Sequence, residues 1–233
     1  MMVQVQNLTV QYGSEDPLVL QDLGFSLEPG ARVALIGANG AGKSTLLLSL
    51  LGLIKPRTGE ITLGGIPMSR ERLGELRKLA GMVFQDPDTQ LFMPTLADDI
   101  GFGLRNYGFD EKTIEARIAA ILAQLGIGHL KNRLSHKLSG GEKRLAALAG
   151  VLVMEPALLL LDEPSAFLDP RSRRTLISIL AGLPQTMLVA THDLALALEL
   201  CPKAILLKEG RVFAEGLTRE LLQDHTLLDQ AGL

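Results

Sequence analysis

A glycine-rich segment, GANGAGKST at residues 37–45, has the residue types and spacing that phosphate binding requires. It satisfies G-x-x-x-x-G-K-[ST], follows the apolar run RVALI and leads into the apolar LLLSLLGLI. Its backbone N–H groups can surround phosphate oxygens, Lys43 can supply charge to the β- and γ-phosphates, and Ser44 can ligate Mg²⁺. The expected nucleotide contacts come from Gly37, Asn39, Gly40, Ala41, Gly42, Lys43, Ser44 and Thr45.

Two adjacent carboxylates end a second apolar run, in LLLLDEP at residues 158–164. Buried carboxylates are costly unless a cation or a water molecule needs them. We expect Asp162 to help hold Mg²⁺, and Glu163 to polarise the water that attacks the γ-phosphate. The alternative is a carboxylate pair that caps a helix before Pro164.

A histidine ends a third apolar run, TMLVATH at residues 186–192. Such a histidine, taken alone, can be structural or solvated. Because the carboxyl ends of parallel strands meet at one edge of a sheet, His192 is expected beside Asp162, Glu163 and the phosphate loop. There it would contact the γ-phosphate or the attacking water.

A second candidate anion site lies in KLSGGEKRLAALAGVLVMEP, residues 137–156. Ser139 can cap a helix whose first N–H groups are left unobstructed by Gly140 and Gly141. Glu142 can complete the cap, so a plain helix start is the alternative. A second phosphate cradle, separate from the first, suggests binding of nucleotide that another subunit holds.

The elements that must position these residues alternate between strands and helices. Continuous apolar runs are typical of strands buried on both faces of a parallel sheet, and they occur at 32–37, 80–85, 157–163, 186–192 and 204–210. With helices between them, they predict an α/β fold. The first thirty residues instead alternate with period two and predict an antiparallel piece, which segments 59–65 and 210–216 could join.

Residues 86–156 lack strand signals and predict a helical insertion between core segments 1–85 and 157–233 of one domain. Asp110 can cap one helix that Gly126 ends, and a second helix should run from Ser139 to Met154. The apolar stretch from Leu145 is broken by Glu155-Pro156 before it reaches the length of a membrane span, so it predicts a buried helix and then a buried strand.

The loop FQDPDTQLF, residues 84–92, carries apolar residues that a loop does not need. Pro87 should stop any helix that would include it and push Asp86 toward extended geometry. The composition around these motifs is globular: 47% hydrophobic, net charge −3 and pI ≈ 5.8, which supply no basic face for nucleic acid. The lone Cys201 excludes an internal disulfide and favours a reducing compartment, and the amino end shows no secretory signal.

The motifs together resemble the ATPase cassette of ABC transporters. They occur in the order GANGAGKST, Gln85, LSGGE, LLLLDEP, SAFLDP and His192, and cover essentially the whole chain. The resemblance implies a P-loop NTPase (RecA-like) parallel-sheet core, an N-terminal antiparallel β subdomain and an inserted helical subdomain. It also implies a head-to-tail dimer with two ATP molecules between one subunit's phosphate loop and the other's LSGGE segment.

The resemblance assigns further roles to single residues. Ser139 and Gly141, with their neighbours Gly140 and Glu142, would contact the opposing γ-phosphate. Asp169 would bridge the subunits, Gln85 would couple Mg²⁺ and the water to a membrane partner, and Tyr12 would stack on adenine. Two positions depart from the family pattern: Glu142 stands where many members have glutamine, and Phe167 where a small residue is usual before the Leu-Asp pair.

FQDPDTQLF, DDIGFG and SGGEKRLAALAGVLVMEP are similar to ATPases of energy-coupling-factor importers, especially the cobalt/nickel branch. That resemblance implies a second ATPase subunit (identical or a paralogue), a substrate-binding membrane component, and a transmembrane coupling protein contacted near residues 85–93. Leu91, Phe92 and Met93 would line a groove of the ATPase for a helix of that coupling protein, unless Phe92 packs on the helical insertion. The subunit would lie peripherally on the cytoplasmic face of the inner membrane.

Three alternatives to a cobalt or nickel importer remain open. A biotin-type importer would use the same ATPase. A soluble ABC ATPase acting on ribosomes or DNA would normally bring two cassettes, a long coiled-coil insertion or a basic patch. A non-hydrolysing nucleotide sensor would be expected to lose Glu163, His192 or Lys43, and all three are present.

Overall fold

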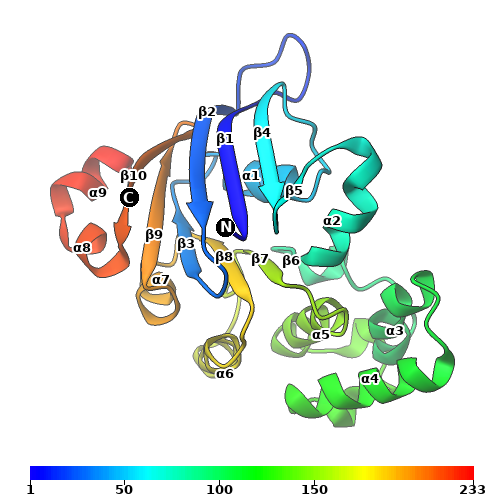
Figure 1. Cartoon of the computed structure of the whole chain (residues 1–233). Coiled ribbons are helices and arrows are strands. Elements are labelled where there is room, and N and C mark those ends of the chain that lie inside the picture. Colours follow the sequence, from blue (N-terminus) through cyan, green and yellow to red (C-terminus); the bar gives the residue numbers. More distant parts are fainter. The chain divides into compact units, whose positions relative to one another are not determined.

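The computed structural model describes residues 1–233, which form two compact units. We call them the sheet unit, formed by Met1–Met82, Ala157–Glu163 and Pro184–Leu233, and the helical unit, formed by Val83–Pro156 and Pro164–Leu183. The helical unit thus contains the predicted insertion and also residues 164–183. Figure 1 shows the elements of both units.

A six-stranded sheet, in the order β10-β9-β3-β8-β7-β6, forms the centre of the sheet unit. Its strands are β3 (Arg32–Ile36), β6 (Ala80–Val83), β7 (Leu158–Asp162), β8 (Thr186–Thr191), β9 (Lys203–Lys208) and β10 (Arg211–Leu217). β3 pairs in parallel with β8 and β9, and β7 pairs in parallel with β8. β7 and β8 are buried along their whole length, which confirms that the continuous apolar runs are buried strands of a parallel core.

An antiparallel sheet of four strands, β2-β1-β4-β5, precedes and follows the phosphate loop in the sequence. It contains β1 (Val3–Val10), β2 (Leu20–Leu27), β4 (Thr58–Leu63) and β5 (Ile66–Pro67). Val3 faces Leu27 and Val5 faces Phe25, and all four side chains are buried, as period-two alternation predicts. The expected antiparallel piece is confirmed, and 59–65 contributes to it through β4.

The placement of 210–216 in that antiparallel sheet is wrong. β10 instead pairs antiparallel with β9 at the edge of the six-stranded sheet, with Arg211 opposite Lys208. Glu209 and Gly210 form the two-residue connection and have φ values of 48° and 75°. Positive φ at both positions is what a type I′ hairpin turn requires, so β10 folds back directly onto β9.

The helices of the sheet unit are short. They are α1 (Lys43–Leu50), the one-turn η1 (Arg70–Arg72), α2 (Leu73–Leu79), α7 (Leu194–Leu200), α8 (Thr218–Gln223) and α9 (His225–Ala231). α1 packs on β7, and α8 packs on β10 and α9 (Figure 1). α1 follows β3 directly after the phosphate loop, so the strand–loop–helix context of that loop is confirmed.

The helical unit is built from α3 (Leu96–Asn106), α4 (Glu111–Gln124), α5 (Gly140–Leu152) and α6 (Pro170–Ala181), with one-turn 3₁₀ helices η2 (Pro87–Thr89), η3 (Gly128–Leu130) and η4 (Ser135–Lys137). α3 packs on both α4 and α5 (Figure 1). Asp110 caps α4 through the Thr113 N–H at 3.0 Å, and Gly126, with φ 69°, follows its end. The first predicted helix is confirmed, and so is the second, which ends two residues before Met154.

Two further expectations concern helix ends and membrane spans. Pro87 does not stop a helix but opens η2, because proline is compatible with a first helical position, while Asp86 is extended as expected and accepts the Asp88 N–H at 2.9 Å. The stretch from Leu145 divides into α5 and β7, as predicted. No helix combines the length and the hydrophobicity that crossing a bilayer requires.

Candidate active site

The phosphate loop joins β3 to α1 and owes its conformation to three glycines. Gly40 and Gly42 have φ values of 82° and 103°, where a side chain would be strained. Gly37 is needed for a different reason: a Cβ at that position would lie 2.5 Å from the Leu207 carbonyl oxygen of β9. The loop therefore leaves its backbone bare before the first turn of α1. Asn39 is exposed in the loop, and Ala41 is buried.

The Lys43 side chain is buried against this loop. Its Nζ donates to the carbonyl oxygens of Gly37, at 2.7 Å, and Ala38, at 3.3 Å. The same Nζ lies 3.7 Å from Glu163 Oε1, and both side chains are 7% exposed. Positive charge is thus held where phosphate would meet the loop, next to the carboxylate from the end of β7.

Glu163 is held by the residues that end β8. The pairing of Asp162 with Ala190 brings the carboxyl ends of β7 and β8 together. The Glu163 Oε2 atom accepts the Thr191 hydroxyl at 3.2 Å and the His192 N–H at 3.3 Å, and its Oε1 atom lies 2.9 Å from His192 Nδ1. The His192 side chain is 61% exposed, so its ring can reach a ligand that the buried carboxylate also faces.

The other predicted residues of the sheet unit are Asp162, Ser44, Thr45 and Tyr12. Asp162 is buried at the end of β7, and Ser44 is exposed in the first turn of α1. The Tyr12 hydroxyl lies 2.9 Å from Thr45 Oγ1, and Tyr12 is 60% exposed. This hydrogen bond ties the Tyr12 hydroxyl to α1.

In the helical unit, the start of α5 carries the LSGGE segment. Ser139 and Glu142 form a capping box: Glu142 Oε2 accepts the Ser139 N–H at 2.7 Å and its hydroxyl at 2.8 Å, while Ser139 Oγ accepts the Glu142 N–H at 3.4 Å. These hydrogen bonds from the Ser139 N–H and hydroxyl lower the pKa of Glu142 below its usual range. A Cβ on Gly140 would meet no other atom within 4 Å, so that position faces open space.

Asp169 caps α6 beside the start of α5. Its Oδ2 accepts the Ser172 hydroxyl at 2.5 Å, and its Oδ1 accepts the N–H groups of Arg171 and Ser172. The hydrogen bonds from Ser172 hold the pKa of Asp169 below its usual range. A Cβ on Gly141 would lie 2.5 Å from Ser172 Oγ, so a side chain at that position would displace Ser172.

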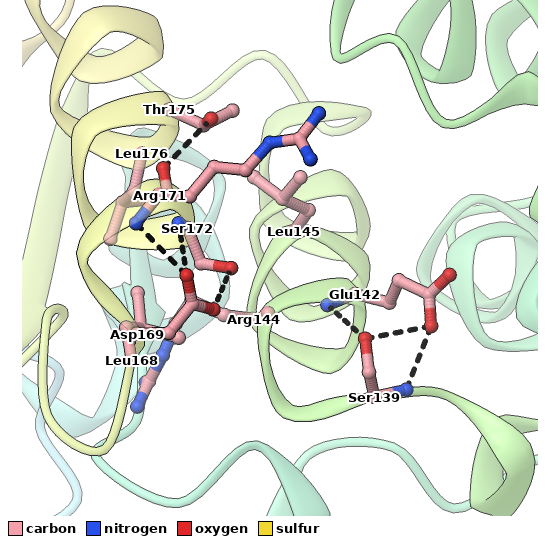
Figure 2. A pocket seen from close by; sticks show the side chains of 11 residues that line it. Ser139, Glu142, Arg144, Leu145, Leu168, Asp169, Arg171, Ser172, Thr175 and Leu176 are labelled. Carbon is pink, nitrogen blue, oxygen red and sulfur yellow. Dashed lines mark hydrogen bonds between the residues drawn. The ribbon is translucent and has the colours of Figure 1, made fainter.

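Four of the predicted residues line one pocket of about 490 Å³ within the helical unit: Ser139, Gly141, Glu142 and Asp169. Figure 2 shows the capping box on one side of this pocket, and Asp169 with Ser172 on the other. The remaining predicted residue of this unit, Gln85, is exposed just after β6. The structure thus forms one group around Glu163 and a second around the start of α5.

Several residues of these groups were not predicted, among them Thr191, Ser172 and Arg144. Thr191 immediately precedes His192 at the carboxyl end of β8, a position from which its contact with Glu163 could have been inferred. Ser172 stands three residues after the helix cap Asp169, the spacing of a capping contact. The partners of Arg144 are main-chain carbonyl oxygens, which sequence patterns do not mark.

Residues 20–166 match the family model described as ABC transporter, and this range includes the phosphate loop, the start of α5 and Glu163. The chain belongs to the ABC transporter family. The resemblance seen in the motifs is thereby confirmed, as is the expected α/β fold.

Among relatives of this ABC protein is the energy-coupling factor transporter ATP-binding protein EcfA of Methanoculleus marisnigri, 41% identical over 236 residues, with 100% of this chain and 85% of that protein covered. The solved structure of CbiO1 from Clostridium perfringens, part of the ABC transporter complex CbiONQ, gives a TM-score of 0.87 at 36% identity and covers 99% of this chain and 94% of that one. The dimeric cassette MJ0796 bound to ADP and Pi gives 0.84 at 26% identity, with 94% and 99% covered. The chain is an ATP-binding subunit of an ABC transporter of the energy-coupling-factor type, an ATPase whose hydrolysis is coupled to transport.

Proposed function

We propose that this ATPase powers an energy-coupling-factor importer of cobalt or nickel ions, and that Glu163 is its catalytic carboxylate. The observation that carries the catalytic part is the placement of Glu163 between the Lys43 ammonium and the strand end Thr191-His192. A carboxylate in that position can accept a proton from an attacking water while the lysine charge faces the phosphates.

The two carboxylate oxygens of Glu163 have different partners, which supports separate roles for Thr191 and His192. Thr191 and the His192 main chain orient one oxygen, and the His192 ring lies against the other. His192 would bind the γ-phosphate or the water through its exposed ring. Lys43 would exchange its contacts with the loop carbonyl oxygens for the β- and γ-phosphates of ATP, and Tyr12 would pack on adenine.

The expected Mg²⁺ would be held by the Ser44 hydroxyl, the Asp162 carboxylate and Gln85. These are oxygen donors, which Mg²⁺ prefers, and no cluster of three or more His, Cys, Asp or Glu forms a protein-only metal cage. That donor set fits an ion that arrives with nucleotide and keeps several waters. The ion would neutralise charge on the β- and γ-phosphates.

The pocket at the start of α5 supports a second nucleotide contact, made in trans. Ser139, Gly140, Gly141 and Glu142 would face the γ-phosphate of ATP held by a second ATPase subunit, identical or paralogous, and Asp169 would bridge the two. A helix N-terminus with bare glycines favours an anion. The similarity to a dimeric cassette supports this arrangement.

The membrane partner is proposed to bind the loop after Gln85. Phe92 is 63% exposed there, and its ring packs edge-on against the ring of Phe102, which is 39% exposed, with the ring centroids 4.9 Å apart. Together with Leu91 and Met93 it would line the contact with a transmembrane coupling protein, next to a substrate-binding membrane component. The ATPase would then lie peripherally on the cytoplasmic face of the membrane.

The catalytic assignment is tested with Glu163→Gln. We expect hydrolysis to be abolished, ATP binding to be retained and an ATP-bound dimer to accumulate, because the amide cannot accept the water's proton. Steady-state phosphate release and equilibrium ATP binding measure the two properties. Glu209→Gln is the matched control, an exposed carboxylate of the same unit that also has positive φ. Normal turnover by Glu163→Gln would contradict the assignment.

The cargo is tested in cells that carry this subunit with its native membrane components. We expect ATP-dependent uptake of labelled cobalt or nickel that the Glu163→Gln subunit abolishes. Uptake of biotin without uptake of either metal would replace this cargo with a vitamin.

A further inference from the structure

Arg144 is a buried cation of α5, with 2% of its surface exposed. Its Nη1 donates to the Phe84 carbonyl oxygen at 2.7 Å, and its Nη2 donates to the Gln85 carbonyl oxygen at 2.7 Å. A further contact of Nη2 reaches the Ala166 carbonyl oxygen at 3.5 Å. One side chain therefore joins α5 to the loop after β6 and to the loop before Asp169.

The planar guanidinium suits this position in a way that an ammonium does not. Two parallel N–H donors can meet two consecutive carbonyl oxygens at once, whereas lysine offers a single nitrogen. Arginine also stays charged when buried, and its hydrogen bonds to carbonyl oxygens compensate for lost hydration. The contact therefore fixes the orientation of the chain at residues 84–85 as well as its distance from α5.

Two neighbouring contacts tie the same loop to α5. Gln90 accepts the Phe84 N–H through Oε1 at 3.4 Å and donates from Nε2 to the Ala147 carbonyl oxygen at 2.9 Å. Lys143 Nζ lies 2.6 and 2.9 Å from the two carboxylate oxygens of Asp88. Lys143, Arg144 and Ala147, within little more than one turn of α5, thus hold residues 84–90.

We propose that Arg144 is a positioning residue for ATP hydrolysis: it makes the loop of Gln85, the loop before Asp169 and the Ser139 end of α5 move as one body. The inference rests on the proposed roles of Gln85 and Ser139. Movement of the loop by a membrane partner would pass to the start of α5 through this cation, since the loop cannot shift alone without breaking both short hydrogen bonds.

The test compares Arg144→Lys, which keeps the charge and loses the fork, with Arg117→Lys as the matched control. Arg117 donates to the Val153 carbonyl oxygen at the other end of α5, at 3.4 Å. Steady-state ATPase activity, equilibrium ATP binding and hydrogen–deuterium exchange of residues 84–92 are measured on the full chain. We expect Arg144→Lys to lower kcat about 10-fold, to change the Kd for ATP less than about twofold, and to speed exchange in 84–92. The control should change none of these.

A kcat within about twofold of wild type, or unchanged exchange in residues 84–92, overturns the proposal. An equal loss of kcat and of ATP affinity would also overturn it, because it would mean a general loss of structure. Should Arg144→Lys not fold, Gln90→Ala takes its place, since it leaves the buried Arg144 charge untouched. Faster exchange in residues 84–92, with a loss of kcat smaller than about 10-fold, would support the proposal. Wild-type exchange and kcat would refute it. Parallel assays of Glu163→Gln distinguish failure of the proposed function from failure of the proposed role of Arg144. Normal turnover by Glu163→Gln would refute the catalytic assignment. The exchange rate of residues 84–92 in Arg144→Lys would still test the role of Arg144.

Discussion

Glu163 combines a buried carboxylate with an unusual backbone conformation. Its φ of 44° lies in the left-handed region, which costs a non-glycine residue about 1 kcal/mol. The Glu163 N–H donates to the Ala190 carbonyl oxygen at 2.8 Å, which holds the turn in place. The strained turn aims the carboxylate at Thr191, His192 and Lys43 instead of letting β7 continue in register.

Cys201 is the residue whose ionisation burial changes most clearly. Desolvation raises the pKa of its thiol from 9.0 to about 12. Because the thiolate is the reactive form, native protein at pH 8 should react with a disulfide reagent on the order of 10³-fold more slowly than urea-unfolded protein. A raised folded pKa contributes stability below pH 9.0 that is lost as the pH rises toward 12. The rate of colour release in native and unfolded samples provides the measurement, and equal rates would contradict the burial of this thiol.

At the level of single residues, types and spacing predicted where Lys43, Glu163 and His192 lie in the fold, but few of their contacts. The phosphate pattern and the strand-end positions of Glu163 and His192 are visible because the sequence letters themselves bear the donors and charges. Arg144 could not be assigned, because main-chain oxygens accept its hydrogen bonds and any residue can supply them. The packing of Gly37 against the Leu207 carbonyl oxygen depends on strand order, which single-sequence patterns leave open.

Among the elements, α4 has the most clearly marked ends. Asp110 accepts both the Thr113 N–H and its hydroxyl, the latter at 2.6 Å, and Gly126 follows the helix. Ile114 and Ile118 are fully buried on one face. Capping and periodicity agree here, so both ends of the helix were predictable.

The cap of α4 can be tested by Asp110→Ala. Hydrogen bonds from Thr113 lower the pKa of Asp110, so its stabilising contribution is present above the ordinary value of 3.8 and is lost as the pH falls through the lower folded value. We expect a lower urea midpoint for Asp110→Ala at pH 7, with a difference from wild type that shrinks below pH 4. Asp110→Asn should keep the midpoint near wild type at pH 7, since asparagine also caps. An unchanged midpoint in Asp110→Ala would show that the cap does not stabilise the chain.

The β9–β10 hairpin shows why one element was misplaced. Alternation in 210–216 predicted a strand but not its neighbour, and the neighbour is set by the turn. Glu209-Gly210 is a two-residue connection with glycine second, a signal that could have placed β10 beside β9. The seven-residue strand β10 was therefore predictable from its alternation, whereas the strand it pairs with is set by the Glu209-Gly210 turn.

For the whole molecule, the proposed head-to-tail dimer makes each nucleotide site a shared one. Ser139→Arg would place a bulky charged side chain at the pocket in which the neighbour's nucleotide is proposed to bind. We expect mixed dimers with one such subunit to lose hydrolysis at the site facing the altered α5. Full turnover at both sites of a purified mixed dimer would exclude the shared arrangement.

The path of the chain through the two units has a consequence for dissection of the protein. The backbone crosses between the sheet unit and the helical unit four times, because residues 157–163 return to the sheet before 164–183 join the helices again. A fragment of residues 83–156 would therefore contain Ser139 and Gly141 but would lack Asp169 and Ser172, and with them one wall of the pocket. No single proteolytic cut can release the helical unit whole, because β7 and Glu163 lie in the sequence between the two segments that form its pocket.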